Sequence, residues 1–331
     1  MNVVRGIMNR VAIPHTDLLA APLALGTANL GVNVSEEEGK RILDRFVGQG
    51  GNLIDTARVY SDWIPGEKNR SERILGDWLA ERKARDRVLI STKGGHPFLP
   101  PCADTVPRLA PAQLDEDISG SLKSLRAETI DLYWLHRDDP ALPVGPIMDS
   151  LHRFQKSGRI RFYAASNWTP ERMEEANAYA YGCGYDGFVA SQVEWNPGVF
   201  HRLPGGDPTM LNFSAGFLRL HRETGLAAIP YASQAGGYFS KRSRDAGSVS
   251  GSPYDTPENR ALHAVLAEIA EELRFSMTQV VLAYLWSHPF PVIPIVGCRT
   301  LEQLNDSLSA AGCRLPEEAM FKINRLINLN G

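Results

Sequence analysis

Residues 52–60 read Asn-Leu-Ile-Asp-Thr-Ala-Arg-Val-Tyr, and this stretch decides the fold and contains the first candidate site residues. Two glycines precede a short apolar run, which predicts a buried strand that ends at Asp55, with Tyr60 in the following loop. A buried carboxylate needs a cation or several donors, because burying it alone is very costly. A phenol has a reference pKa of about 10, and a nearby cation lowers this value. The stretch therefore predicts a lysine or arginine from elsewhere in the chain.

Two later apolar runs have the same form. One covers residues 88–93 and ends at Lys93, and the other covers residues 130–136 and ends at His136. Each places an ionisable side chain after a strand-like segment, so both qualify as partners for Asp55 and Tyr60.

Size and charge restrict the class of protein. The chain has 331 residues, 43% of them hydrophobic, which allows a large core. Because α/β barrels of about 250 residues or more commonly form one domain, we expect a single domain over residues 1–331. The net charge of -3 and the lack of a basic stripe argue against nucleic acid as a partner.

Neither a membrane nor an oxidising compartment is expected. The sequence has no apolar run of about 18 residues that predicts a membrane span, and residues 1–16 contain no apolar signal region. The cysteines are widely spaced without a CxxC pair, so we expect a reduced, cytoplasmic protein. They are Cys102, Cys183, Cys298 and Cys313.

Strand-like and helix-like segments alternate along the chain. The strand candidates are short and lack polar alternation, which is typical of strands buried on both faces of a parallel sheet. They cover residues 23–25, 53–54, 88–92, 130–135, 160–165, 188–192, 227–231 and 292–296. Amphipathic helices are expected at residues 36–49, 71–82, 113–125, 147–157, 170–181, 212–224, 257–273, 276–287 and 316–328.

Eight such units favour a (β/α)8 TIM barrel, and the rival is an open doubly wound sheet. Residues 3–21 are expected to contain a small hairpin or an extended piece that covers one end. Ser35 should cap the first helix, with Glu38 completing a capping box. Three connections, 94–112, 194–209 and 236–257, are long and follow strands, so they are expected at the C-terminal face, where barrel enzymes bind substrates.

Polar side chains follow most of the expected strands, where a barrel carries its catalytic groups. Taken singly, Asp55 could cap a turn, Lys93 could be solvated, and His136 could be a satisfied core histidine. Together they favour a functional site. The residues at the strand ends are Gly26, Thr27, Asp55, Lys93, His136, Ser166, Asn167, Gln192, Tyr231 and Gly297.

These motifs resemble the aldo-keto reductases, in order from about residue 23 to residue 308. The resemblance implies reduction of an aldehyde or ketone to an alcohol by hydride transfer from NAD(P)H. It assigns Asp55, Tyr60, Lys93 and His136 as a catalytic tetrad. Tyr60 would donate the proton, Lys93 would lower the pKa of Tyr60, Asp55 would hold Lys93, and His136 would hydrogen-bond the developing oxyanion.

The resemblance also implies a cofactor site in which NADP(H) is favoured over NAD(H). Ser166, Asn167 and Gln192 would hold the nicotinamide amide, and Tyr231 would stack on its ring. Arg299 and Gln303 would contact the 2′-phosphate, near a helix N-terminus that suits phosphate. The complete expected set is Gly26, Thr27, Asp55, Ser166, Asn167, Gln192, Tyr231, Ser233, Gln234, Ala235, Lys241, Gly297, Arg299, Gln303 and Ser307.

The substrate is less clear from the sequence. Its pocket could be lined by Arg58, Trp63, Trp134, Trp168 and Trp195, and several of these could equally pack in the core. Arg137, Asp138 and Asp139 after His136 could suit a polyol or sugar.

Two other functions remain open. One is an NADPH-binding regulatory subunit similar to potassium-channel β subunits, and the other is a lyase with Lys93 as a Schiff base. Residues 182–187 match GxGxxG but follow a helix and precede a strand, the reverse of a dinucleotide-binding fold. No metal site is expected, because the histidines are scattered.

Overall fold

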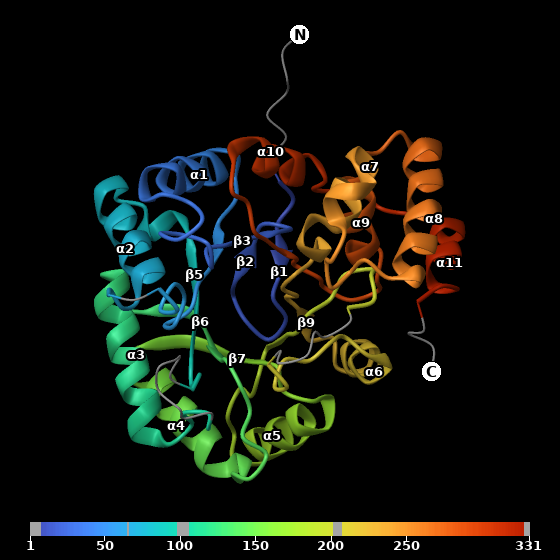
Figure 1. Ribbon diagram of the computed structural model, residues 1–331. Coiled ribbons are helices and arrows are strands. Elements are labelled where there is room, and N and C mark those ends of the chain that lie inside the picture. Colours follow the sequence, from blue (N-terminus) through green and yellow to red (C-terminus); the bar gives the residue numbers. More distant parts are fainter. Residues whose placement is uncertain (1–7, 65, 98–105, 201–206, 328–331) are drawn as a thin grey trace.

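A ring of parallel strands forms the centre of the molecule, with helices around it (Figure 1). The computed structural model describes residues 8–64, 66–97, 106–200 and 207–327. From β3 to β9 each strand hydrogen-bonds to the next in chain order, and β10 pairs with β3. The strands are β3 (Ala24–Gly26), β4 (Leu53–Asp55), β5 (Leu89–Gly94), β6 (Ile130–Leu135), β7 (Ile160–Ser166), β8 (Ala190–Gln192), β9 (Ala227–Ala228) and β10 (Ile295–Val296).

The ring closes between β9 and the segment that leads into β10. Ala228 pairs with Val292 in a parallel bridge, and the amide of Ile295 donates to the carbonyl of Pro230. The predicted (β/α)8 barrel is therefore confirmed, and the open sheet is excluded because a doubly wound order reverses at a switch point.

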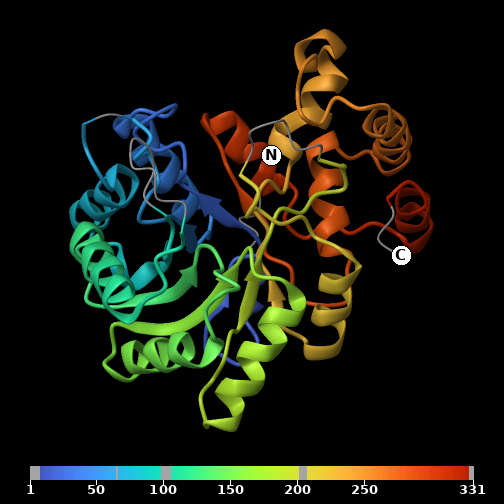
Figure 2. The same ribbon diagram turned by 60° about the horizontal axis from the view of Figure 1, so that its bottom comes forward.

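Helices cover the outside of the barrel, and α8 and α11 lie side by side outside it (Figures 1 and 2). Their starts follow simple capping chemistry. Ser35 caps α1 by accepting from the amide of Glu38, and Pro occupies the first turn of α3, α5 and α8. The helices are α1 (Glu36–Gly48), α2 (Arg70–Arg82), α3 (Pro111–Leu125), α4 (Val144–Lys156), α5 (Pro170–Gly182), α6 (Ala215–Thr224), α7 (Tyr238–Arg244), α8 (Pro257–Leu273), α9 (Met277–Trp286), α10 (Leu301–Ser309) and α11 (Glu317–Asn324).

The predicted N-terminal hairpin is confirmed as β1 (Val11–Ala12) paired antiparallel with β2 (Leu19–Ala20). The side chain of Asn52, just before β4, accepts from the amide of Ala21 at 2.7 Å and donates to the carbonyl of Leu19 at 2.9 Å. Ile13 and Leu18 join the apolar cluster formed by strand residues inside the barrel. The hairpin thus covers the end opposite the polar strand ends.

Several predicted boundaries were wrong for identifiable reasons. The seventh barrel strand was expected to reach Tyr231, but β9 ends at Ala228, and Pro230 has no amide to donate to a ladder. The side chain of Glu38 does not complete the capping box, because it forms an ion pair with Arg41 at 3.2 Å. The connection 236–257 contains α7, which was predicted only as loop.

Parts of the other two long connections, residues 98–105 and 201–206, lie outside the described residues. The GxGxxG match at residues 182–187 joins the end of α5 to the segment before β8, as the sequence predicted. Gly184 and Gly187 have φ values of +76° and +74°, so these glycines serve a turn.

His221 on α6 supports β8 from outside the barrel, and it should make stability depend on pH. Its Nδ1 lies 2.7 Å from the carbonyl oxygen of Leu226, which can only accept, so Nε2 must accept from the Ser191 hydroxyl at 2.8 Å. Burial lowers the pKa of His221 to about 4. Because the folded state binds fewer protons, stability is full above pH ~6.5 and falls as the pH drops towards ~4.

We therefore expect His221→Gln to weaken this pH dependence. Denaturant unfolding between pH ~6.5 and ~4.5 should show a loss of stability smaller by roughly 2–3 kcal/mol in the variant than in the parent protein. Equal losses in the two proteins would contradict the neutral, buried state assigned to His221.

Candidate active site

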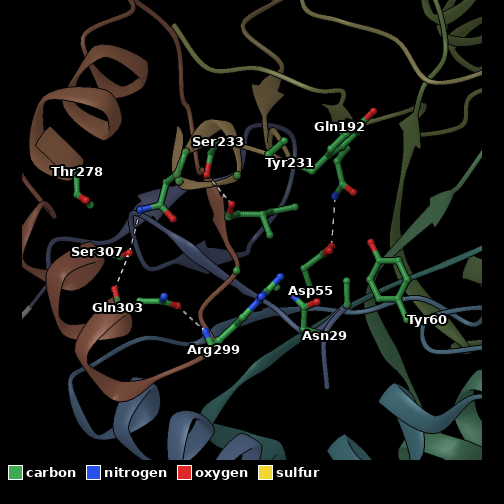
Figure 3. Close-up of a pocket in the computed structure, with 18 of the residues that line it drawn as sticks. Asn29, Asp55, Tyr60, Gln192, Tyr231, Ser233, Thr278, Arg299, Gln303 and Ser307 are labelled. Atoms are coloured by element: carbon green, nitrogen blue, oxygen red, sulfur yellow. Dashed lines mark hydrogen bonds between the residues drawn. The ribbon is translucent and has the colours of Figure 1, made fainter. Parts of the chain in front are cut away.

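A pocket of about 560 Å³ lies at the carboxyl ends of the barrel strands (Figure 3). Tyr60, Asp55 and Gln192 lie together on one side of it, and Gln303 and Ser307 lie on the other. The predicted site residues that line it are Gly26, Asp55, Tyr60, His136, Ser166, Asn167, Gln192, Tyr231, Ser233, Gln234, Lys241, Gly297, Arg299, Gln303 and Ser307.

Lys93 lies behind the wall of this pocket and makes the cation contact predicted from residues 52–60. Its ammonium is 2.5 Å from Oδ2 of Asp55, 2.8 Å from the carbonyl oxygen of Thr56 and 3.1 Å from the hydroxyl of Tyr60. Only 1% of Lys93 is exposed. Because an ammonium has three N–H donors, these three acceptors satisfy it completely.

The protonation states follow from burial and charge. Burial alone would lower the pKa of Lys93, but Asp55 and Tyr60 outweigh it and raise that pKa above 10.5. Burial also raises the pKa of Tyr60 above 10.0, and the charge of Lys93 only partly offsets this. Lys93 was expected to lower the pKa of Tyr60 overall. The charge of Lys93 does lower the pKa of Tyr60, but the increase caused by burial is larger. Tyr60 is therefore protonated at neutral pH.

His136 completes this side of the pocket as a neutral imidazole. Burial and the positive charge of Arg137 lower the pKa of His136 well below 6.5. Its ring meets that of Tyr60 edge-on, with 6.0 Å between centroids, and lies 4.7 Å from the ring of His96. Its Nδ1 has no hydrogen-bond partner among the residues that the structure describes. A neutral imidazole keeps one N–H, so His136 can donate one hydrogen bond.

Hydrogen bonds from neighbouring strands hold Asp55 in place. Its Oδ1 accepts from the hydroxyl of Ser91 at 2.9 Å and from the amide of Gln192 at 3.3 Å. The indole N–H of Trp134 in turn donates to the Ser91 hydroxyl at 2.8 Å. Ser91 was not predicted as a site residue, although it lies on a strand that ends at the site. Trp134 was expected to line the substrate pocket, but it is fully buried and supports Asp55 through Ser91.

Amide and aromatic groups line the next part of the pocket. Asn167 adopts a left-handed backbone conformation with φ +58°, and its Oδ1 accepts from the hydroxyl of Tyr231 at 2.9 Å and from the amide of Leu211 at 3.0 Å. Its Nδ2 donates to the Ser166 hydroxyl at 3.1 Å. Together with Gln192, this set offers donors and acceptors suited to a carboxamide, beside the phenol ring of Tyr231.

Glycines and cations form the part suited to phosphate. Gly236 and Gly297 line the pocket, and an added Cβ at either would meet no atom within 4 Å, so a ligand can approach the backbone there. Lys241 and Arg244 of α7 and Arg299 after β10 add positive charge to the lining. The residues present therefore fit a dinucleotide with phosphate groups.

The start of α10 gives the pocket its last wall. Thr300 caps the helix by accepting from the amide of Gln303, and the side chain of Gln303 accepts from the backbone amide of Arg299 at 2.8 Å. The amide of Gln234 donates to the hydroxyl of Ser307 at 3.1 Å, which links the loop after β9 to α10 (Figure 3). Arg299 is thus held by its backbone, while its side chain lines the pocket.

Some predicted site residues do not line the pocket. Thr27 accepts from Ser71 and donates to the carbonyl of Asp55, which places it beneath the site. Ala235 is buried beside α7. Neither contributes to the lining, so a cofactor role for their side chains has no support in the geometry.

Arg58 and the tryptophans predicted for the substrate pocket, Trp134 and Trp168 included, also lie outside the lining. Arg58 is directed at α3, where it contacts Ser124 and lies 3.7 Å from Glu72. Trp195 is 3% exposed and stacks on Phe213 at 3.8 Å between ring centroids. Trp63 is 45% exposed on the loop after Tyr60. The prediction of a tryptophan-lined substrate pocket was therefore wrong for Trp195, which packs in the core.

Other lining residues were missed because they do not end predicted strands. Most lie one or more residues into a loop or on helices that approach from the side. They include Ala28, Asn29, Met210, Ser240, Arg244, Thr278 and Asp306. Arg137, which the sequence analysis named as a possible substrate contact, does line the pocket.

In the part of the chain that the structure describes, no group of three or more His, Cys, Asp or Glu side chains could hold a metal ion. No helix in the described part of the chain is long and apolar enough to cross a membrane.

The fold and the polar strand ends define a barrel oxidoreductase, and comparison with known proteins identifies its family. Residues 22–328 match the aldo/keto reductase family, so the chain belongs to that family. Members of the family use nicotinamide cofactors.

Individual relatives are distant but cover most of the chain. The norsolorinic acid reductase of Emericella nidulans is 28% identical over 96% of this chain and 81% of its own length. A putative aryl-alcohol dehydrogenase of Saccharomyces cerevisiae is 28% identical over 96% of this chain and 86% of its own length. An aryl-alcohol dehydrogenase of Phanerodontia chrysosporium, named as NADP(+)-dependent, is 26% identical over 97% of this chain and 86% of its own length.

We expect Ser91→Ala to damage the site through Asp55. The change leaves the indole N–H of Trp134 buried without its acceptor and removes one donor from Asp55, so the free energy of unfolding should fall by about 1–3 kcal/mol. Turnover should fall more than affinity for the cofactor. Denaturant unfolding and steady-state kinetics measure the two effects.

Ser150→Ala is the matched control for Ser91→Ala. Ser150 is equally buried, but it lies on α4 and donates to the carbonyl of Pro146 one turn earlier. Its loss should leave turnover unchanged. Equal effects of the two variants on turnover would remove the positioning role of Ser91.

Proposed function

We propose that this protein is a carbonyl reductase that uses NADPH in preference to NADH, with Tyr60 as the proton donor. The observation that carries the proposal is the position of the Lys93 ammonium between Asp55, at 2.5 Å, and the hydroxyl of Tyr60, at 3.1 Å, at the wall of a pocket. The whole chain, residues 1–331, would act as one catalytic domain. The same site can oxidise an alcohol when the cofactor ratio favours it.

The proposed chemistry divides the work between the cofactor and four side chains. When bound, NADPH supplies the hydride that reaches the carbonyl carbon. Tyr60 protonates the carbonyl oxygen, a form of acid catalysis that typically contributes about 10²–10⁴-fold. The neutral His136 donates a hydrogen bond to the same oxygen as negative charge develops. Lys93, kept charged by Asp55, stabilises the phenolate that Tyr60 leaves behind.

The cofactor would lie along the length of the pocket. Ser166, Asn167 and Gln192 would hold its carboxamide, with the ring of Tyr231 against the nicotinamide. Ser233, Gln234 and Lys241, which also line the pocket, would contact the pyrophosphate. Preference for NADPH would come from Arg299 and Gln303, and Arg244 adds a cation to the lining that could serve the same phosphate.

We further propose an aromatic aldehyde or ketone as the substrate class. The support is the set of relatives named as aryl-alcohol dehydrogenases and as a reductase of norsolorinic acid. Met210 lines the pocket, and a thioether packs favourably against aromatic rings. The polyol or sugar suggested by residues 137–139 has less support, because Asp138 is paired with Arg172.

Two rival functions are less well supported. A regulatory subunit that only binds NADPH would not need a lysine that touches both a carboxylate and a phenol. A lyase that forms a Schiff base on Lys93 needs a neutral, accessible amine. Here the ammonium is 1% exposed, its pKa is raised, and three acceptors occupy its hydrogens.

Tyr60→Phe tests the proton donor. Removing the hydroxyl should lower turnover of an aromatic aldehyde by at least about 10²-fold while the dissociation constant of NADPH stays within about threefold. Turnover is followed by NADPH absorbance and binding by intrinsic fluorescence. Tyr181→Phe, at an exposed tyrosine on α5, is the control. Full turnover in Tyr60→Phe would reject the assignment.

Arg299→Ala tests the preference for NADPH. Losing a hydrogen bond to a charged group costs about 1.5–3 kcal/mol, so the KM for NADPH should rise by about 10–100-fold and that for NADH little. Arg41→Ala, at an exposed arginine on α1, is the control for charge. An equal rise for both cofactors would remove the role of Arg299 at the 2′-phosphate.

A further inference from the structure

Arg137 is a buried cation in the pocket that the proposed chemistry does not use. It follows His136 directly, it lines the pocket, and only 6% of it is exposed. Burying a guanidinium is costly unless it is paired, so its partners show what it can still bind.

Its pairing leaves donors unused. Nη2 donates to Oδ2 of Asp207 at 2.8 Å, Nε donates to the hydroxyl of Thr209 at 2.8 Å, and Nη1 donates to the carbonyl of His136 at 2.8 Å. A guanidinium has five N–H hydrogens. One hydrogen on Nη1 and one on Nη2 therefore have no acceptor among the residues that the structure describes.

Asp207 makes the Arg137 side of the pocket electrically neutral. Burial alone would raise the pKa of Asp207, but the bonds from Thr209 and Arg137 outweigh it and lower that pKa to about 2. Its carboxylate is thus ionised at neutral pH and lies within 3.2 Å of both Nε and Nη2 of Arg137. A second carboxylate brought to the same guanidinium would meet this charge.

The same contacts fix the neighbouring wall. Oδ1 of Asp207 accepts from the backbone amide of Thr209 at 2.8 Å, and the amide of Leu211 donates to Asn167 at 3.0 Å. Met210 lies between these two anchored residues and lines the pocket. Arg137 is therefore held rigidly beside His136, at the end where the reacting carbonyl is proposed to bind.

We propose that Arg137 is a specificity-determining residue that binds an uncharged acceptor on the substrate, such as a ring hydroxyl, a methoxy group or a second carbonyl, while Asp207 excludes a carboxylate. The inference rests on the proposed reduction of aromatic carbonyl compounds. The acceptor takes the unused N–H hydrogens, and no charge has to be neutralised. Substrate discrimination thus comes from hydrogen bonding combined with like-charge repulsion.

Asp207→Asn tests the exclusion of carboxylates. The substrates are benzaldehyde and its 2-, 3- and 4-hydroxy and 2-, 3- and 4-carboxy derivatives, with kcat/KM measured for each at saturating NADPH. The parent enzyme should favour the best hydroxy derivative over benzaldehyde and disfavour every carboxy derivative. We call the kcat/KM of the best carboxy derivative divided by the kcat/KM of benzaldehyde the carboxylate ratio. In Asp207→Asn this ratio should rise at least about tenfold. An unchanged ratio would overturn the proposal.

Two further variants distinguish the effect of the Asp207 charge from the effect of holding Asp207 and Arg137 in a fixed position. Thr209→Val removes the hydroxyl that braces Asp207 and Arg137 but keeps both charges, so the carboxylate ratio should not change. A rise equal to that in Asp207→Asn would overturn the proposal, because loosening alone would then explain it. Arg137→Met should abolish the preference for hydroxy derivatives, whereas a preserved preference would also overturn it.

A binding measurement distinguishes this inference from the proposed reduction. In a Tyr60→Phe background with NADPH bound, turnover is strongly reduced, so fluorescence titration gives the affinity for each aldehyde. Adding Asp207→Asn should tighten binding of a carboxy derivative about tenfold relative to benzaldehyde. An unchanged relative affinity would overturn the role of Arg137 and Asp207. Absence of aldehyde reduction by the parent enzyme would instead overturn the proposed function.

Discussion

The ion pair between Lys93 and Asp55 is the interaction on which the site depends. Neither charge could be buried alone, because the desolvation cost would shift its pKa until it became neutral. The pair also needs every remaining donor and acceptor satisfied. Thr56, Tyr60, Ser91 and Gln192 supply those bonds, so the carboxylate and the ammonium are the centre of a connected polar network.

The register of the strands brings the residues of this network together. Asp55 on β4 lies opposite Ser91 on β5, and Lys93 follows two residues later. Because side chains alternate along a strand, Ser91 and Lys93 face the same side, and both reach Asp55. Gln192 lies on β8, four places away from β4 in the ring of eight strands. Its bond to Asp55 therefore crosses the mouth of the barrel, which only a closed sheet permits.

The sequence predicted the parts of the site that follow from local pattern. Asp55, Lys93, His136 and Gln192 were found because apolar strands end at them, and the barrel brings strand ends together. The eight strands and most helices were found for the same reason. Trp195 was wrongly predicted to line the pocket, because a tryptophan after a strand can point towards a pocket or into the core. The sequence alone does not show which of the two sides can accommodate the ring.

What the sequence did not predict depends on contacts between distant segments. Asn29 and Thr278 reach the pocket from a loop and a helix, where no strand ending marks them. The pairing of Arg137 with Asp207 joins residues 70 positions apart. The upward shift in the pKa of Tyr60 required the balance between burial and the charge of Lys93, and burial cannot be measured from residue types alone.

This balance has a consequence for the direction of the proposed reaction. A protonated Tyr60 is ready to give its proton to a carbonyl oxygen, so reduction starts from the resting state of the site. Oxidation of an alcohol needs Tyr60 to lose its proton first, and burial opposes that loss while Lys93 assists it. If Tyr60 is the proton donor, the site should favour reduction at neutral pH, and oxidation should gain as the pH rises towards the pKa of Tyr60. Burial therefore acts on function through the protonation state of one phenol.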